Sequence, residues 1–251
     1  MEKIDFKKTM KDLYRATSKI KHVEPGEGTF LAVDGQGLIY LGMKDHVEVL
    51  DPTGKPIAHW ESLGPRAIVT CVAVSDSAVY LADAGQLLVW EFTPSGSLRW
   101  TLGKKDPTKG VPGYVIPSPY FDVAVGTDGS PWVANTGRHS LENYTPSGAL
   151  KTSWGEYGTA IEAFCGCCNP SHFAIMSDGG FVTSEKGIAR IKTYDREGKF
   201  LDVVAGPDQF RTGTEGLDLA TDGAGRIYVL DPAQKAVRIF AKAHARQEGV
   251  E

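Results

Sequence analysis

Three of the four cysteines in this 251-residue chain lie within four positions, and a histidine follows them closely. The segment reads CGCCNPSH over residues 165–172, which places three sulfur donors and one imidazole on a short stretch of chain. Thiolates are soft ligands that suit Zn²⁺, Cu⁺ or an iron–sulfur cluster, and imidazole adds a nitrogen donor. Neighbouring thiols can also exchange with disulfides. The segment therefore predicts either a transition-metal site (Cu, Zn or Fe) with Cys165, Cys167, Cys168 and His172 as ligands, or a thiol-redox site.

The cysteine spacing also leaves a simpler alternative open. Zinc ribbons pair two C-x₂-C knuckles, and this chain has no second cysteine pair, because Cys71 stands alone far upstream. A disulfide framework of the secreted type would need many more cysteines in a shorter chain. Free cysteine packs well in apolar cores, so buried inert thiols are the competing interpretation.

Composition restricts the partners and the location. The net charge of -4 argues against a general electrostatic attraction to nucleic acid or to an anionic membrane surface. No apolar stretch approaches the roughly 20 residues of a membrane span. The first twenty residues are charged and lack the apolar core of a signal peptide, so the sequence as given carries no export signal. We expect a protein that is cytoplasmic, or exported with its leader removed.

A turn motif recurs four times and indicates an internal repeat. In each copy an aromatic residue or leucine is followed four positions later by glycine, and in three copies a tryptophan comes within six positions of that glycine. The pairs are Leu50/Gly54, Phe92/Gly96, Tyr144/Gly148 and Tyr194/Gly198, and the tryptophans are Trp60, Trp100 and Trp154. Each copy is typical of a strand that enters a tight turn and of a second strand that leaves it.

A second aligned block defines the repeat over its full length. Phe30, Thr70, Asp122, His172 and Asp218 occupy the same position in five copies, which we call the first column. Thirteen residues later come Met43, Asp83, Asn135, Glu185 and Asp231, which we call the third column. The copies are separated by 40 to 52 residues, and each contains candidate strands in a pattern of four. Four-stranded units of this length predict the blades of a β-propeller.

The chain is therefore predicted to be all-β, with five recognisable propeller blades over residues 25–251. Residues 1–24 are predicted to form an N-terminal helix and a closure segment. After Phe240 the repeat breaks, so the last blade needs an outer strand from elsewhere, and the segment KIKHVE at 19–24 is the candidate. Closure by the opposite end of the chain would remove an exposed sheet edge.

The segments VAVGTDGSPWVANTGRHSLENYTPSG and DLATDGAGRIYVLDPAQKAVRIF resemble the NHL-repeat β-propellers, and the resemblance spans roughly residues 24 to 243. The blade that begins FCGCCNPSH resembles a bacterial subgroup of these proteins. The resemblance implies a propeller, usually of six blades, so six blades are the alternative to five. It also implies a structural part for His46 and His139, which stand near the position of the family's return-turn histidine.

Propeller geometry predicts where the polar columns meet. The start of a blade's first strand lies beside the end of its second strand, on one face of the disc. We expect Asp122, His172 and Asp218 to surround one channel mouth, with Asp83, Asn135, Glu185 and Asp231 behind them and Cys71 at the same rim. Two long connections, residues 103–121 and 155–171, belong to this face, and long loops in compact domains are often functional. Asp and Asn at strand ends can instead cap turns.

Two functions follow from this arrangement. The first is a propeller with a Cys/His metal-binding or thiol-redox site at one channel mouth. The second is a non-catalytic propeller that binds a small molecule or a protein there. Nucleic acid is excluded as a partner because the columns at the mouth are acidic.

Overall fold

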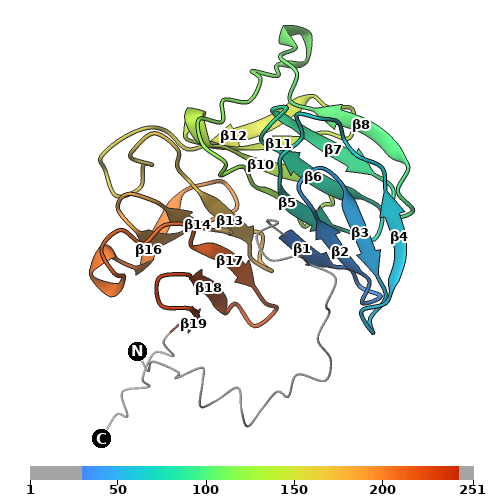
Figure 1. Ribbon diagram of the computed structural model, residues 1–251. Coiled ribbons are helices and arrows are strands. Elements are labelled where there is room, and N and C mark those ends of the chain that lie inside the picture. Colours follow the sequence, from blue (N-terminus) through green and yellow to red (C-terminus); the bar gives the residue numbers. More distant parts are fainter. Residues whose placement is uncertain (1–29, 243–251) are drawn as a thin grey trace, which may run out of the picture.

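The structure, a computed structural model, describes residues 30–242 and contains five antiparallel sheets that follow one another along the chain (Figure 1). The first sheet is β1 (Phe30–Val33), β2 (Ile39–Gly42), β3 (Val47–Leu50) and β4 (Pro56–Trp60), and the second is β5 (Val69–Val74), β6 (Val79–Asp83), β7 (Leu88–Phe92) and β8 (Leu98–Leu102). The third is β9 (Val123–Val125), β10 (Pro131–Asn135), β11 (Ser140–Tyr144) and β12 (Leu150–Trp154). The fourth is β13 (His172–Ile175), β14 (Phe181–Glu185), β15 (Arg190–Tyr194) and β16 (Phe200–Ala205), and the fifth is β17 (Asp218–Thr221), β18 (Ile227–Asp231) and β19 (Ala236–Phe240).

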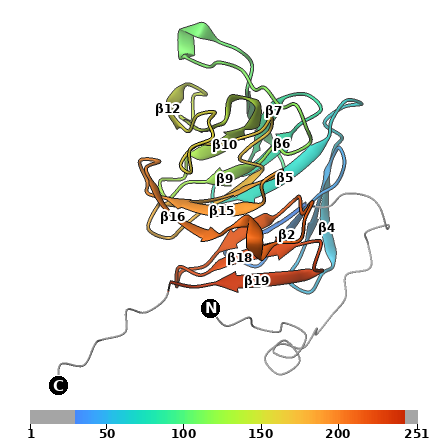
Figure 2. The same ribbon diagram turned by 90° about the vertical axis from the view of Figure 1, so that its left-hand side faces the viewer.

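The sheets form a β-propeller, which confirms the predicted fold class and the five blades. The first strands contact one another in chain order, β1 with β5, β5 with β9, β9 with β13 and β13 with β17. In the perpendicular view the third, fourth and fifth sheets follow one another from top to bottom (Figure 2). Within the described residues the fifth sheet has three strands, as expected from the break after Phe240. The helix and closure segment predicted at 1–24 lie outside the described residues.

The predicted register is confirmed in the strand bounds. The third-column residues Asp83, Asn135, Glu185 and Asp231 are the last residues of β6, β10, β14 and β18. In the first column, His172 begins β13 and pairs with Ser184, and Asp218 begins β17 and pairs with Leu230. The repeat therefore brings equivalent positions of successive blades to the same level of the propeller.

Little helix interrupts the sheets. Three single-turn 3₁₀ helices occupy connections: η1 (Pro107–Lys109), η2 (Thr136–Arg138) and η3 (Pro207–Gln209). The connection that carries η1 extends away from the sheets (Figure 1). In residues 30–242 no helix is long and apolar enough to cross a membrane.

The recurring glycine and tryptophan pack neighbouring blades together. Trp60, at the end of β4, lies over Gly96 in the turn of the next blade, and Trp154, at the end of β12, lies over Gly198 in the same way. Trp154 also packs on Tyr194, with ring centroids 4.7 Å apart. The glycines have φ of +88° and +83°, a region that side chains other than glycine rarely adopt. The repeat thus encodes both the turn and the contact between blades.

Replacing Gly198 with alanine tests this contact. A Cβ at this position would lie 2.3 Å from Cγ of Trp154, so strain from the positive φ adds to overpacking, and we expect Gly198→Ala to lower the free energy of unfolding by about 2–4 kcal/mol. Gly129→Ala is the matched control, because its φ is +80° and no heavy atom lies within 4 Å of the added carbon. Urea unfolding gives both values. Equal losses in the two variants would show that the tryptophan contact adds nothing.

Candidate functional site at the channel mouth

The first strands of all five blades surround a central cavity of about 750 Å³. Its polar lining consists mainly of the first-column residues Asp122, His172 and Asp218 and of Cys71, which directly follows the first-column residue of the second blade. The rest of the wall is mainly apolar, with Phe30 from β1 and Phe173 from β13 among its residues. The structure therefore brings four of the predicted site residues together in one place.

His172 lies between two carboxylates. Its Nδ1 atom is 3.7 Å from Oδ2 of Asp122 and 3.8 Å from Oδ1 of Asp218. Burial alone would lower the pKa of His172, but the interaction with Asp122 and the charge of Asp218 outweigh it, so the pKa is raised above its ordinary value. The imidazolium form is thus favoured inside the channel.

The two carboxylates differ in how they are held. Asp122 is buried and accepts hydrogen bonds from the backbone N–H groups of Val123 (3.1 Å) and Phe173 (3.0 Å), which fixes its orientation. The Asp218 side chain is 57% exposed, yet the protein packed around it and the charge of Asp122 raise its pKa. Asp122 is therefore the fixed partner of His172, and Asp218 is the partner that solvent reaches.

Cys71 completes this group as a protonated thiol. Its Sγ donates a hydrogen bond to the carbonyl oxygen of Val123 at 3.3 Å. Burial, followed by the nearby charges of Asp122 and Asp218, raises the pKa of Cys71 well above its ordinary value. The thiolate that nucleophilic or soft-ligand chemistry requires is disfavoured at Cys71.

The third-column residues do not line the cavity. They are buried and bind the turns and connections next to their strands: Asp83, Asn135, Glu185 and Asp231. Asp83 accepts from the N–H groups of Ile68 (2.9 Å) and Gly85 (3.0 Å), and Asn135 accepts from Val115 N–H at 2.9 Å. These contacts match the turn-capping alternative.

Glu185 and β15 hold the connection at 155–171 in place. The Glu185 carboxylate pairs with Arg190 at 2.7 Å and with Lys192 at 2.8 Å. Lys192 also donates to the carbonyl oxygens of Ile161 (3.1 Å) and Ala163 (2.8 Å). Burial lowers the pKa of Lys192, although the Glu185 carboxylate opposes this shift, while Glu185 raises the pKa of Arg190. Long polar side chains from β15 thus fix the backbone that leads into the cysteines.

The three cysteines of this connection face two different places. Cys165 turns toward the buried ion pairs, with its Sγ 3.8 Å from Glu185 Oε2 and 3.7 Å from Arg190 Nη2. Cys167 and Cys168 face each other with their Sγ atoms 3.1 Å apart, and both are free thiols. The side chain of Cys167 is exposed and that of Cys168 is buried.

The four predicted metal ligands are therefore not gathered at one point. Within residues 30–242, the one group of three or more His, Cys, Asp or Glu side chains with ligand atoms close enough to share an ion is His46, Glu48 and His59. His172 instead packs against Tyr120, with ring centroids 5.6 Å apart. Because the cysteines and His172 belong to different contacts, the structure does not favour a single four-ligand centre.

Residues from two other segments surround the vicinal thiols. Lys186 follows β14, and its Nζ lies 3.5 Å from Ser118 Oγ and 4.9 Å from the centre of the Tyr120 ring. Burial disfavours the Cys168 thiolate, but Ser118, Cys167 and the charge of Lys186 outweigh burial, so the pKa of Cys168 is lowered. The contact with Cys168 raises the pKa of Cys167. Of the two cysteines, Cys168 is therefore the one whose thiolate the surroundings favour.

No motif in the sequence singles out Ser118, Tyr120 or Lys186. Ser118 and Tyr120 belong to the long connection at 103–121. The length of that connection is the one sequence feature that indicates a functional part for them, because the connection is expected on the same face as the cysteines. Lys186 directly follows the third-column Glu185, and only the backbone of the β14–β15 turn places it beside Cys168.

Comparison with known proteins supports the fold. No protein-family model matches the chain, and no curated protein matches it in sequence. Solved structures do match in fold: streptogramin B lyase (11% identity, TM-score 0.59), a catalytically inactive virginiamycin B lyase from Staphylococcus aureus with quinupristin (15%, 0.59) and a protein of unknown function from Bacteroides thetaiotaomicron (16%, 0.60). The matches cover 87% of this chain and 66%, 68% and 60% of those chains. The chain thus spans about two thirds of the length of these β-propeller proteins.

Replacing Asp122 with asparagine is expected to lower the pKa of His172, because burial then acts with less opposition. Since the native pKa is raised, the Asp122–His172 interaction stabilises the fold below pH of about 6.5 and is lost as pH rises through the native pKa of His172. NMR titration of the His172 ring measures the shift. Asp202→Asn, on the exposed outer strand β16, should leave it unchanged. An unaltered His172 pKa in Asp122→Asn would show that Asp122 does not set its charge.

Replacing Lys192 with methionine is expected to lower the free energy of unfolding by about 3 kcal/mol. The change removes one partner from a buried charge cluster and one hydrogen bond from each of the Ile161 and Ala163 carbonyl groups. Lys151→Met is the matched control. Lys151 pairs with Asp128 at 2.7 Å on the surface, so its loss should cost less than about 1 kcal/mol. Chemical denaturation measures both. Similar small losses would mean that the cluster does not secure the connection.

Proposed function

We propose that Cys167 and Cys168 form a redox-active dithiol at the channel mouth, which exchanges with a disulfide in a small molecule or a protein that binds there. The observation that carries this proposal is the 3.1 Å separation of the two Sγ atoms beside Lys186 and Ser118, an environment that favours the Cys168 thiolate. Thiolates are the nucleophiles of thiol–disulfide exchange.

The two cysteines differ in exposure, which suits them to different steps of the thiol–disulfide exchange. Cys167 is exposed and can reach a ligand, whereas Cys168 is 1% exposed and needs to reach only Cys167. Cys167 therefore attacks the ligand disulfide, and Cys168 resolves the mixed disulfide. The sulfur atoms must approach by about 1 Å to reach the S–S bond length of about 2.05 Å.

The exchange balances as follows. The Cys167 thiol gives its proton to the Cys168 thiolate, and its sulfur bonds to one sulfur of the ligand disulfide. The other half of the ligand leaves as a thiolate and takes the proton from Cys168. The Cys168 thiolate then bonds to Cys167 sulfur and displaces the second half, which water protonates. Two electrons pass from the dithiol to the ligand, which leaves as two thiols.

Ligand geometry favours this chemistry over a closed metal centre. A structural zinc site needs four donors, and a catalytic site needs three protein donors. Of the predicted ligands, Cys165 binds the Glu185–Arg190 pair and His172 lies between carboxylates. Two thiols remain, which suits a dithiol.

The propeller scaffold supplies a place for the ligand. A cavity of about 750 Å³ falls within the range of small-molecule sites, about 300–1,000 Å³. The His172 ring and the two carboxylates beside it offer both hydrogen-bond donors and acceptors in an otherwise mainly apolar channel. We propose that this channel binds part of the ligand, and that the NHL-like repeat of the sequence reflects membership of that group of propellers.

Reaction with an aromatic disulfide such as 4,4′-dithiodipyridine tests the dithiol. In a Cys165→Ser background the chain should release two equivalents of thiopyridone and lose two hydrogens in mass, because Cys168 resolves the adduct. Cys168→Ser should release one equivalent and keep the adduct on Cys167, and Cys167→Ser should react slowly. Absorbance and intact-mass spectrometry measure these outcomes.

Two further variants separate chemistry from structure. Lys186→Met should slow the resolving step, whereas Lys199→Met, at an exposed turn, should not. Cys71→Ser should leave the stoichiometry unchanged, because the pKa of the Cys71 thiol is raised well above its ordinary value and its reactive thiolate is therefore disfavoured. A stable adduct on Cys167 in a chain that retains Cys168 would contradict the proposed resolving role.

A further inference from the structure

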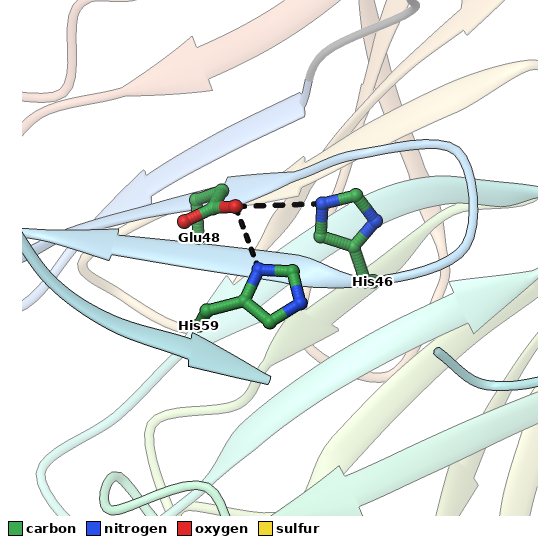
Figure 3. A group of neighbouring side chains, drawn as sticks. All are labelled: His46, Glu48 and His59. Atoms are coloured by element: carbon green, nitrogen blue, oxygen red, sulfur yellow. Dashed lines mark hydrogen bonds and ion pairs between the residues drawn. The ribbon is translucent and has the colours of Figure 1, made fainter. Parts of the chain in front are cut away.

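A second group of side chains lies on the outer half of the first blade, away from the cysteines of the fourth blade. Glu48 of β3 and His59 of β4 are directly paired in the strand register, and His46 immediately precedes β3 (Figure 3). Glu48 Oε1 lies 3.5 Å from His46 Nε2 and 2.7 Å from His59 Nδ1. The two imidazole rings have centroids 4.8 Å apart. Three potential ligands from three positions of the chain therefore converge.

We propose that His46, Glu48 and His59 bind a divalent transition metal ion of the Zn²⁺ class. Two imidazole nitrogens and one carboxylate oxygen are a donor set that zinc commonly takes, with a water molecule at the remaining position. One ligand atom from each residue lies within 4.8 Å of the others, so small side-chain rotations bring all three to bonding distances of about 2.0–2.2 Å. The side chains are 24%, 31% and 54% exposed, which leaves an ion free access.

Asp45 adds an independent observation. Its Oδ1 accepts a hydrogen bond from His46 Nδ1 at 2.9 Å, so the Nε2 atom that faces Glu48 carries the free lone pair. Asp45 is itself held by Ser62 Oγ at 2.7 Å, and its backbone carbonyl accepts from Leu63 N–H at 2.7 Å. A carboxylate that orients the second nitrogen of a histidine is the usual support of a metal-binding histidine.

The same contacts can exist without an ion, as a hydrogen-bonded surface network in which each histidine donates to Glu48. The hydrogen-bonded network and the metal site lead to different expectations for variants of these residues. Metal binding needs all three ligands and a correctly oriented His46, whereas a surface network of this exposure contributes little to folding. A bound ion would also tie β4 to β3 and raise the melting temperature, because a ligand that binds only the folded chain stabilises it.

Metal titration of protein made without a histidine tag tests the site. A Cys165→Ser/Cys167→Ser/Cys168→Ser background removes the thiols as competing ligands. We expect one equivalent of Zn²⁺, measured by competition with a chromophoric chelator, and a rise in melting temperature with added Zn²⁺. His59→Ala and Glu48→Gln should abolish both effects, and Asp45→Asn should weaken binding about 10- to 100-fold.

Two controls replace a histidine and a glutamate elsewhere in the chain. His139→Asn keeps the positive φ that asparagine tolerates, and Glu61→Gln removes an exposed carboxylate two positions after His59. Both should bind Zn²⁺ as the background protein does. Binding that survives in His59→Ala and Glu48→Gln would place the ion elsewhere, and a background protein that binds no Zn²⁺ would leave only the hydrogen-bonded network. Either result overturns the proposal, and neither bears on the dithiol.

Discussion

The buried carboxylate of Glu185 is the interaction on which the candidate dithiol depends. A buried ion pair is by itself weak support for stability, because the desolvation of its charges can exceed their attraction. The ion pairs of Glu185 instead determine where the neighbouring connection lies. Glu185 compensates Arg190 and Lys192, which allows Lys192 to remain buried and to donate to Ile161 and Ala163. Those carbonyl groups lie on the segment that leads into Cys165, so the course of the cysteine connection follows from one charge at the end of β14.

The other blades use the same position for a simpler purpose. Asp83 accepts from the N–H group of Ile68 in the short connection before β5, and Asp231 accepts from that of Gln234 in the turn after β18. Asn135 binds Val115 in the long connection before β9. In the second, third and fifth blades the last residue of the second strand thus accepts hydrogen bonds from backbone N–H groups of neighbouring turns or connections. The fourth blade adds two cations to this arrangement, Arg190 and Lys192 of β15, and Lys192 binds the connection at 155–171.

Much of the fold could be predicted because its determinants are local and repeated. Turn glycines, alternating strands and the recurrence of Trp60 and Trp154 fixed the number of blades and the strand ends before any long-range contact was known. The grouping of Asp122, His172 and Asp218 was predictable for the same reason, since equivalent positions of a propeller share radius and height.

The geometry of both candidate sites could not be predicted in this way. Cys165 turns away from Cys167 because Arg190 and Glu185 lie beside it, and no spacing rule within the loop contains that information. Glu48 and His59 are eleven positions apart, and their pairing depends on the β3–β4 turn and on a register shift between Val49 and Leu50. A one-residue change in that register would put His59 on the opposite face of the sheet. Sequence patterns therefore predict what repeats, whereas the sites depend on what each blade adds to the repeat.

The charges at the channel mouth form a connected series. The Cys168 side chain contacts Lys186, and Lys186 lies over the ring of Tyr120. The ring of His172 packs against Tyr120 and lies between two carboxylates. Each cation at the mouth thus has an anionic neighbour on one side and contacts the same aromatic ring on the other. In a partly desolvated site, paired charges cost much less than isolated ones. This explains how the pKa of Cys168 can be lowered and that of His172 raised beside an otherwise mainly apolar cavity.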